Sequence, residues 1–233
     1  MSVIIGNNIV RNGLVLNLDA ADPKSYPGSG TTWFDRSGNK NNGTLTNGPI
    51  YSSSNEGIIT FDGVDDYVNL GNPSTLTNLN SSNITIMAAV KPSLRSYGNI
   101  SIFTARGGES NELLFGYNNS DYYLRFDRYP PTGGSAISTT LYSTYNSWNI
   151  IGASATAGNN VIFFNNGATE TVSHTEIYSG DTPNIVSIGA QYQGSSWQRF
   201  FLGDIAFLYV YNRALSVNEM QQNYNALRKR FNI

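Results

Sequence analysis

The sequence contains no cysteine and only one histidine, His174. Without cysteine the chain forms no disulfide, holds no thiolate metal site and has no thiolate nucleophile. One histidine cannot supply the three or four nitrogen and sulfur ligands of an ordinary zinc site. His174 lies in the polar stretch TVSHTE, which gives no context for a catalytic triad, so a surface or turn position is the favoured interpretation.

Long apolar runs and clustered positive charge are also missing. No apolar run approaches the roughly 20 residues that span a bilayer, and the apolar patch at residues 3 to 5 is too short for a signal peptide. The 14 lysines and arginines are scattered and the net charge is -2, so nucleic-acid binding is not expected. We therefore expect a protein made in a cytoplasm, without membrane insertion, that reaches the outside by lysis, unusual secretion or incorporation into a particle.

Short strand patterns recur along the chain. Residues 13 to 19 alternate, with Leu14, Leu16 and Leu18 on one face, and residues 83 to 90 are apolar on both faces, which predicts a doubly covered central strand. Further patterns lie at residues 57 to 61, 66 to 70, 99 to 104, 112 to 117, 121 to 129, 148 to 155, 160 to 172, 184 to 189 and 199 to 211, and residues 160 to 172 indicate a hairpin around Asn165-Asn166-Gly167. A total of about eleven or twelve strands predicts an all-β, two-sheet antiparallel jelly-roll sandwich.

One segment near the C-terminus has the pattern of an amphipathic helix, at about residues 216 to 231. Ser216 and Glu219 form a capping box. The apolar residues that follow recur at steps of three and four and form one stripe: Val217, Met220, Tyr224, Leu227 and Phe231. We expect this stripe to pack on the sandwich; the alternative is a seam for a partner protein.

The segments at residues 19 to 57 and 129 to 147 are rich in Gly, Ser, Thr, Asn and Pro, and we interpret both as long loops. Neither is followed by a second self-sufficient pattern. Residues 1 to 233 are therefore expected to form a single domain, with binding carried by loops at the rim of a rigid β scaffold.

Catalytic residues are scarce as well. Glycoside hydrolysis needs two carboxylates that face each other across a cleft. The chain has six glutamates, and the nearest pair, Glu109 and Glu112, is three residues apart, so the two side chains should point to different sides of a strand. No glycine motif that would cradle a phosphate precedes the helix.

Two turns offer the hard oxygen ligands that calcium prefers. In DRSGNKNNGTL, residues 35 to 45, these ligands include Asp35 and Asn39; in FDGVDD, residues 61 to 66, they include Asp62 and Asp65, and Asp204 is a further acid near the C-terminus. Calcium between these loops is one hypothesis. The other, which we favour, is that they are turn residues that hydrogen-bond to their own backbone.

The sequence is rich in aromatic residues, with 15 tyrosines and three tryptophans, several of them in polar segments. Aromatic side chains in loops can stack on sugar rings or anchor a protein interface. We predict ligand contacts at Trp197, Tyr192, Tyr145 and Tyr129. Trp197, in GSSWQRF, is the preferred exposed anchor, with a packing role as the alternative.

Several segments together resemble a known family. They are GLVLNLDAAD, the W-x-D-x-S-G-N-x-N-x-G-T-L run from Trp33 to Leu45, FDGVDDYV, ITIMAAVKP and the terminal FLGDIAFLYVYNRALSVNEMQQNYNALR. They resemble the laminin-G-like jelly rolls of the concanavalin A-like lectin and glucanase superfamily over nearly the whole chain. The resemblance implies a sandwich with glycan-binding or adhesive function, often with a structural calcium.

Domains with similar YNRALS and QQNYNALR endings also occur in structural proteins of tailed bacteriophages. The family's catalytic E-x-D-x-E strand is absent, and Ala206 and Phe207 stand where many relatives have acids. We therefore expect a non-catalytic structural or surface protein of a virion that binds cell-surface glycans or other virion proteins, with homo-oligomers left open. A stand-alone extracellular lectin and, less favoured, a glycoside hydrolase are the alternatives.

Overall fold

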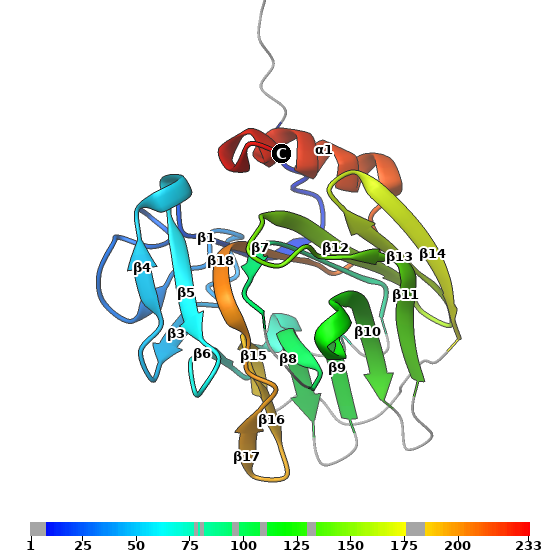
Figure 1. Cartoon of the computed structure of the whole chain (residues 1–233), viewed down its shortest axis with the longest axis horizontal. Coiled ribbons are helices and arrows are strands. Elements are labelled where there is room, and N and C mark those ends of the chain that lie inside the picture. Colours follow the sequence, from blue (N-terminus) through cyan, green and yellow to red (C-terminus); the bar gives the residue numbers. More distant parts are fainter. Residues whose placement is uncertain are drawn as a thin grey trace, which may run out of the picture.

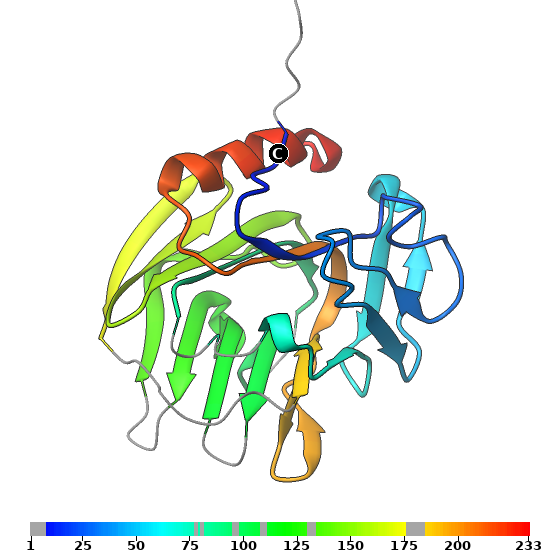
Figure 2. The same ribbon diagram turned by 180° about the vertical axis from the view of Figure 1, so that it is seen from behind.

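The computed structural model describes residues 8–76, 79, 82–94, 98–107, 111–129, 134–175 and 185–233, with the backbone alone for residues 107, 111, 120 and 129. In this part of the chain, 18 strands form two antiparallel sheets of eight strands and a two-stranded hairpin. The sheets pack face to face and a C-terminal helix covers one of them (Figures 1 and 2). The predicted all-β sandwich with one terminal helix is confirmed.

One sheet, sheet A, lies next to the helix. In spatial order it contains β14 (Ala168–His174), β13 (Asn159–Asn165), β12 (Asn149–Thr156), β7 (Ile84–Pro92), β18 (Leu202–Tyr211), β5 (Ile58–Asp62) and β4 (Ile50–Ser52). The eighth strand, β1 (Leu14–Asp19), pairs with the second half of β18, while β5 pairs with the first half. β7 is buried on both faces, as predicted, with Ile86 in the core between the sheets and Met87 beneath the helix.

The second sheet, sheet B, forms the opposite layer. Its order is β11 (Gly134–Tyr142), β10 (Tyr123–Tyr129), β9 (Asn111–Asn118), β8 (Ile100–Gly107), β15 (Ile185–Ile188), β6 (Tyr67–Gly71), β3 (Gly43–Thr46) and β2 (Thr32–Trp33). A hairpin of β16 (Gln191–Gln193) and β17 (Ser196–Gln198) follows β15. Short 3-10 turns lie at η1 (Ser54–Glu56), η2 (Ser74–Leu76) and η3 (Asn119–Asp121).

The predicted strand count was too low, because the two expected loops contain four strands and the hairpin of β16 and β17 adds two more. The segment 19 to 57 holds β2, β3 and β4, and the segment 129 to 147 holds β11. The first three strands have two to four residues each, too few to show a period of two. β11 is mostly polar and half-exposed, so its sequence lacks an apolar face.

The face predicted for β1 is partly wrong. Leu16 and Leu18 enter the core between the sheets as expected, but Leu14 packs on the outer side of sheet A. The pairing of β1 with β18 shifts register between Leu14 and Leu16. Such an irregularity adds a residue and reverses the alternation, so Val15 joins the inner core.

The hairpin between β13 and β14 forms as predicted. Asn165 pairs with Ala168, which leaves Asn166 and Gly167 as a two-residue turn, and both have positive φ, 47° and 94°. This is the conformation that an Asn-Gly turn supplies at low cost.

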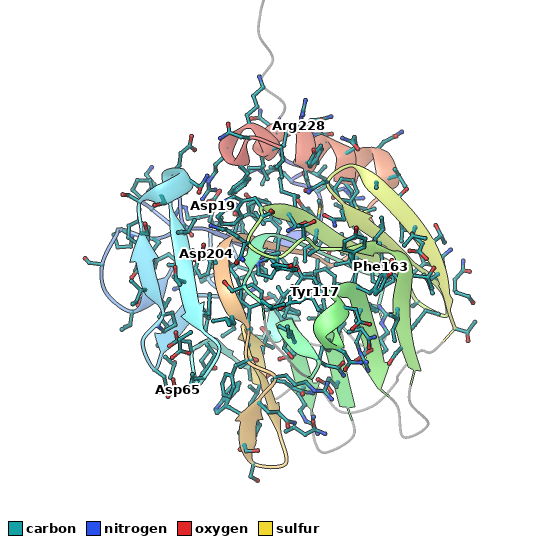
Figure 3. The ribbon with its side chains drawn as sticks, viewed as in Figure 1. Asp19, Asp65, Tyr117, Phe163, Asp204 and Arg228 are labelled. Atoms are coloured by element: carbon teal, nitrogen blue, oxygen red, sulfur yellow. The ribbon has the colours of Figure 1, made fainter. Side chains whose placement is uncertain are left out.

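Large apolar side chains fill the space between the sheets. The largest that are fully buried there include Trp33, Phe61, Phe103, Phe115, Phe126 and Phe163. Figure 3 shows Tyr117 and Phe163 within this layer. Close packing of this kind makes the sandwich a rigid support for the residues on its outer faces.

The helix α1 (Val217–Leu227) continues into a 3-10 turn, η4 (Arg228–Phe231), and the predicted capping box between Ser216 and Glu219 is present. Met220, Tyr224 and Phe231 pack on the outer face of sheet A, so the stripe covers the chain's own sandwich. The prediction for Val217 was wrong: its side chain is 40% exposed. Leu215, before the helix, is 1% exposed and belongs to this cluster.

One carboxylate joins the edge strands of the two sheets. Glu170 of β14 accepts hydrogen bonds from the hydroxyls of Ser138, Thr139 and Thr140 of β11, and from the backbone N–H groups of the two threonines. Partial burial works to raise the pKa of Glu170, but these hydrogen bonds lower it to about 2. The edge is therefore held by a carboxylate that stays ionised at neutral pH.

Candidate functional site

The loop around Asp35 is organised by that one carboxylate. Its Oδ1 accepts hydrogen bonds from the backbone N–H groups of Asn17 (2.9 Å) and Ser37 (2.8 Å). Its Oδ2 accepts from the Ser37 hydroxyl (2.7 Å) and the Asn41 backbone (3.0 Å). Asn39 is exposed and donates its amide to the Ser37 hydroxyl. Because four donors already surround the buried Asp35, the geometry favours a structural turn over a calcium loop.

The other predicted calcium ligands do not form one group. Asp62, Asp65 and Asp66 each offer a carboxylate oxygen within 4.8 Å of the others. Asp204 lies apart from Asp65 (Figure 3) and accepts a hydrogen bond from the Thr60 hydroxyl. Burial, opposed by a backbone hydrogen bond and assisted by the charges of Asp62 and Asp65, raises the pKa of Asp66.

The carboxylates of this acidic turn are partly committed to their own backbone. Asp62 Oδ1 accepts from the N–H groups of Val64 and Asp65, and Asp66 Oδ2 accepts from the N–H of Asp62. The remaining oxygens suit calcium, which the family resemblance implies, but three carboxylates are fewer ligands than the six to eight of a complete calcium shell. If calcium binds, Asp62, Asp65 and Asp66 would hold it weakly.

We expect calcium to stabilise the protein only at millimolar concentration. For a Kd of about 1 mM, about 10 mM calcium adds about 1.4 kcal/mol and raises Tm by about 4 °C. Differential scanning fluorimetry in calcium and in EGTA measures the shift. Asp65→Asn, which removes an exposed carboxylate and keeps the turn's backbone bonds, should abolish the rise. Equal Tm values in calcium and EGTA would remove the metal hypothesis.

Trp197 and Tyr192 face each other across the β16–β17 hairpin, with ring centroids 5.2 Å apart. Trp197 also stacks on Tyr67 at 3.9 Å, with 26° between the ring planes. Its ring is half-buried and one face is covered by the buried Tyr67. The packing role, the alternative in the sequence interpretation, fits this geometry better than a free anchor.

Tyr123 and Tyr142 pair where β10 begins and β11 ends, and Tyr145 follows three residues after Tyr142; we call these three tyrosines the tyrosine platform. Tyr142 is 55% exposed and Tyr145 49% exposed. The ring of Tyr142 packs edge-on against that of Tyr123, with 5.8 Å between the ring centroids. The ring centroid of Tyr145 lies 6.5 Å from that of Tyr122. The sequence interpretation placed only Tyr145 in a site. Tyr142 lies in the same expected loop but was not among the predicted ligand contacts, and the structure places it at the end of β11.

The outer face of sheet B continues from this platform. Along β10, Leu124 and Phe126 enter the core, so the alternate residues Tyr123, Arg125 and Asp127 point outward. Tyr129, the fourth predicted ligand contact, ends β10 and pairs through its backbone with Glu112. Its side chain lies outside the described part of the structure.

Charged and polar side chains gather on this outer face and form what we call the polar face. Its members are Ser101, Arg106, Glu112, Arg125, Asp127, Gln191 and Arg199. Arg125 Nε donates to both carboxylate oxygens of Asp127, at 2.9 and 2.8 Å. Arg106 Nη1 lies 3.7 Å from Glu112 Oε2. Gln191 donates its amide to Glu112.

Glu112 and Asp127 are the carboxylate pair that sequence reasoning missed, because they lie on different strands. Their strands, β9 and β10, are adjacent, and the negative charge of Asp127 helps to raise the pKa of Glu112. Burial raises the pKa of both carboxyls, opposed mainly by Arg199 at Glu112 and by Arg125 at Asp127. Each carboxylate forms an ion pair with an arginine, whereas a catalytic acid and base would need carboxyl groups free to exchange protons with a substrate. Glu109 lies outside the described residues.

The position predicted for His174 was wrong. It ends β14 and is buried, with its ring edge-on to Phe126 at 5.9 Å and Nε2 3.3 Å from the backbone oxygen of Gly134. Burial lowers the pKa of the imidazole. His174 is therefore part of the packing at the sheet edge.

Comparison with family models matches residues 62–221 to Laminin_G_3, described as the Concanavalin A-like lectin/glucanases superfamily. Comparison with curated protein sequences gives no match. Within the described residues, no helix has the length and apolar character needed to cross a bilayer.

Several solved structures share the fold. The binding domain of Paraclostridial Mosquitocidal Protein 1 matches with a TM-score of 0.70 and 14% identity, over 93% of this chain and 52% of that one. A second match is a chain of botulinum neurotoxin type C, a toxin whose cell entry depends on interaction with two ganglioside molecules. Its TM-score is 0.68 and its sequence identity 14%, and the match covers 93% of this chain and 52% of that one. This chain thus spans about half the length of the toxin binding domains.

A third match covers nearly the whole of the other chain. It is domain 4 of AbnA, a GH43 extracellular arabinanase from Geobacillus stearothermophilus, in complex with arabinotriose. The TM-score is 0.65 and the identity 15%, over 91% of this chain and 98% of that domain. At these identities the likeness establishes the fold.

Proposed function

The chain belongs to the Concanavalin A-like lectin/glucanases superfamily, and on this premise we propose that it is a non-catalytic module that binds glycans. The observation that carries the proposal is the tyrosine platform. Tyr142 and Tyr145 expose about half of their surface next to the exposed polar residues Thr144, Asn146 and Ser147. An aromatic ring next to polar groups is the combination that sugar recognition uses.

The platform is held in place before any ligand arrives. Tyr142 and Tyr145 lie close to the rings of Tyr123 and Tyr122. The loop that carries Tyr145 is fixed where the Asn146 backbone donates to Pro92 (2.7 Å), and Asn149 donates its amide to the same loop. Pre-organised rings lose little conformational entropy on binding.

The matched structures support this proposal by analogy. One was solved with arabinotriose and another concerns a toxin that interacts with gangliosides, so the fold serves glycan binding elsewhere. The arginine contacts of Glu112 and Asp127 support the non-catalytic part. Release of reducing sugar from a polysaccharide by the purified protein would instead favour the glycoside hydrolase alternative.

We expect the double variant Tyr142→Ala/Tyr145→Ala to bind its glycan at least about tenfold more weakly, because each lost ring contact is worth roughly 0.5–1.5 kcal/mol beyond its buried area. A glycan array identifies the ligand, and isothermal titration calorimetry measures the affinity. Phe34→Ala, an exposed aromatic next to β2 at the far edge of sheet B, is the matched control. Unchanged affinity in the double variant would reject the platform.

From the resemblance of the C-terminal segment to structural proteins of tailed bacteriophages, we also propose that the module is carried on a virion surface, beside other virion proteins. A stand-alone extracellular lectin is the alternative. Mass spectrometry of purified particles tests the virion role. Neighbouring genes for portal, capsid or tail proteins would favour it, and a polysaccharide-utilisation cluster would favour the lectin.

A further inference from the structure

A cleft of about 270 Å³ lies beside the C-terminal helix, and none of its lining residues belongs to the tyrosine platform. Its walls come from the first described segment, β1 and the turn after it, β18 and α1, and Figure 3 shows Asp19 on this side of the sandwich. The volume is below the roughly 300–1,000 Å³ of pockets for drug-sized ligands, so the cleft suits one small ring. Polar and apolar side chains line it, among them those of Asn17, Asp19, Asp22, Tyr209, Ile9 and Leu227.

Asn17 of β1 lines this cleft and is only 6% exposed. Its backbone is fixed, because its N–H donates to Asp35 at 2.9 Å and its oxygen accepts from the N–H of Arg36 at 2.8 Å. Its side-chain amide, in contrast, has no hydrogen-bond partner within the described residues, and it reaches the cleft, where a ligand can contact it. Buried amides normally have partners, so we expect a ligand or water to pair with this one.

The pairing of β1 with β18 places two more polar side chains beside Asn17. Tyr209 is the Cα partner of Asn17 in this pairing, and its hydroxyl donates to Asp19 Oδ2 at 3.3 Å. Asp19 Oδ1 accepts from Arg230 at 2.7 Å and from the backbone N–H of Ala21 at 3.0 Å. Oδ2 therefore has only the long bond to Tyr209 within the described part of the chain, and it can accept a further hydrogen bond.

The charged groups of the cleft favour a neutral ligand. The carboxylate of Asp19 is paired with Arg230, and that of Asp22, which is 40% exposed, lies 3.4 Å from Arg36. Because both carboxylates already have an arginine, a cation gains little, whereas an anion would meet two negative groups. The exposed Arg11 adds a donor to the cleft. Donors and acceptors side by side match hydroxyl groups, which can both donate and accept.

We propose that this cleft binds one neutral sugar unit, a hexose or a pentose, as a second glycan site. Asn17 pairs with two neighbouring hydroxyls, because an amide offers both a donor and an acceptor, and Asp19 Oδ2 accepts from a third. Ile9 and Leu227, which are half-buried, contact the C–H groups of the ring. The site goes beyond the proposed function, because it uses no residue of the tyrosine platform and either site can fail without the other.

Heteronuclear NMR of the isotope-labelled full chain, titrated with the methyl glycosides of glucose, galactose, mannose and arabinose, tests this proposal. We expect at least one glycoside to shift the side-chain NH2 signal of Asn17 and the backbone signals of Asp22 and Leu227, with the millimolar Kd that one small ring allows. Asn17→Leu should weaken this binding at least about tenfold, as measured on the backbone signals. The matched control Asn218→Leu, at an exposed position on α1, should keep it.

The Asn17→Leu variant also separates binding from folding. Leucine removes no hydrogen bond of the described chain, so Tm should stay unchanged or rise. If this variant fails to fold, Ala226→Trp, which fills the cleft from the helix, decides. No shift with any of the four glycosides, or shifts that survive these substitutions, would overturn the proposal. Shifts lost only in Tyr142→Ala/Tyr145→Ala would overturn it too, but would leave the proposed function standing.

Discussion

Replacing Asp35 by asparagine is expected to lower the free energy of unfolding by about 3 kcal/mol or more, because one buried carboxylate accepts hydrogen bonds from Asn17, Ser37 and Asn41. The amide keeps one acceptor oxygen and turns an NH2 group toward donors. At about 2–4 °C per kcal/mol for a chain of this size, Tm should fall by roughly 6–12 °C. Urea unfolding and thermal melts measure both quantities.

The matched control is Asp22→Asn. Asp22 Oδ1 also accepts a backbone hydrogen bond, from Lys24 at 2.9 Å, but in an exposed turn. We expect this change to cost well under 1 kcal/mol. The Asp35→Asn loss should be the same in calcium and in EGTA, since the carboxylate's partners are protein groups. A loss that appears only in calcium would mean that Asp35 is a metal ligand after all.

Replacing Asn223 by leucine is expected to destabilise the protein by about 3 kcal/mol. The side chain is fully buried in the apolar layer beneath the helix. Its oxygen accepts from the Val10 backbone at 2.7 Å, and its amide donates to the Tyr211 hydroxyl (3.0 Å) and to the sulfur of Met87. Leucine is close in volume, so the main loss is the buried Val10 N–H and Tyr211 hydroxyl left with fewer partners.

Asn218→Leu provides the control for this change. Asn218 is an exposed position on the same helix, so the substitution alters helix propensity equally without touching a buried network. Chemical denaturation should separate the two variants by more than 2 kcal/mol, roughly the value of two buried hydrogen bonds and the penalty for losing them. Equal stability would show that the Asn223 contacts contribute nothing net.

The sequence predicted elements that carry a long apolar period. β7 was identified as doubly covered because both sets of alternate residues, Ile86 and Met87 among them, are apolar. The helix was identified from its capping box and stripe. The burial of Asn223 was not predicted, because a polar residue does not contribute to an apolar stripe. Its contacts with Val10 and Tyr211 nevertheless bury it.

Contacts between distant strands lay beyond the reach of the sequence. Glu112 and Asp127 were not recognised as neighbours because their proximity depends on the register of β9 and β10. Trp197 was predicted as exposed because its flanking residues are polar, but Tyr67, 130 residues earlier, covers one face of its ring. Tyr145, in contrast, is 49% exposed, as expected of an aromatic residue in a polar loop, and its contact with a ligand stays a prediction.

The contact between Val10 and Asn223 brings the first described segment against the C-terminal helix, where Gln222 also donates to the backbone of Asn8. Both ends of the described chain therefore leave from the helix-covered side of sheet A (Figure 1). A scaffold, bead or fusion partner attached at either end would hold the molecule from behind. Sheet B would then be presented outward, ready to meet a polysaccharide-coated surface.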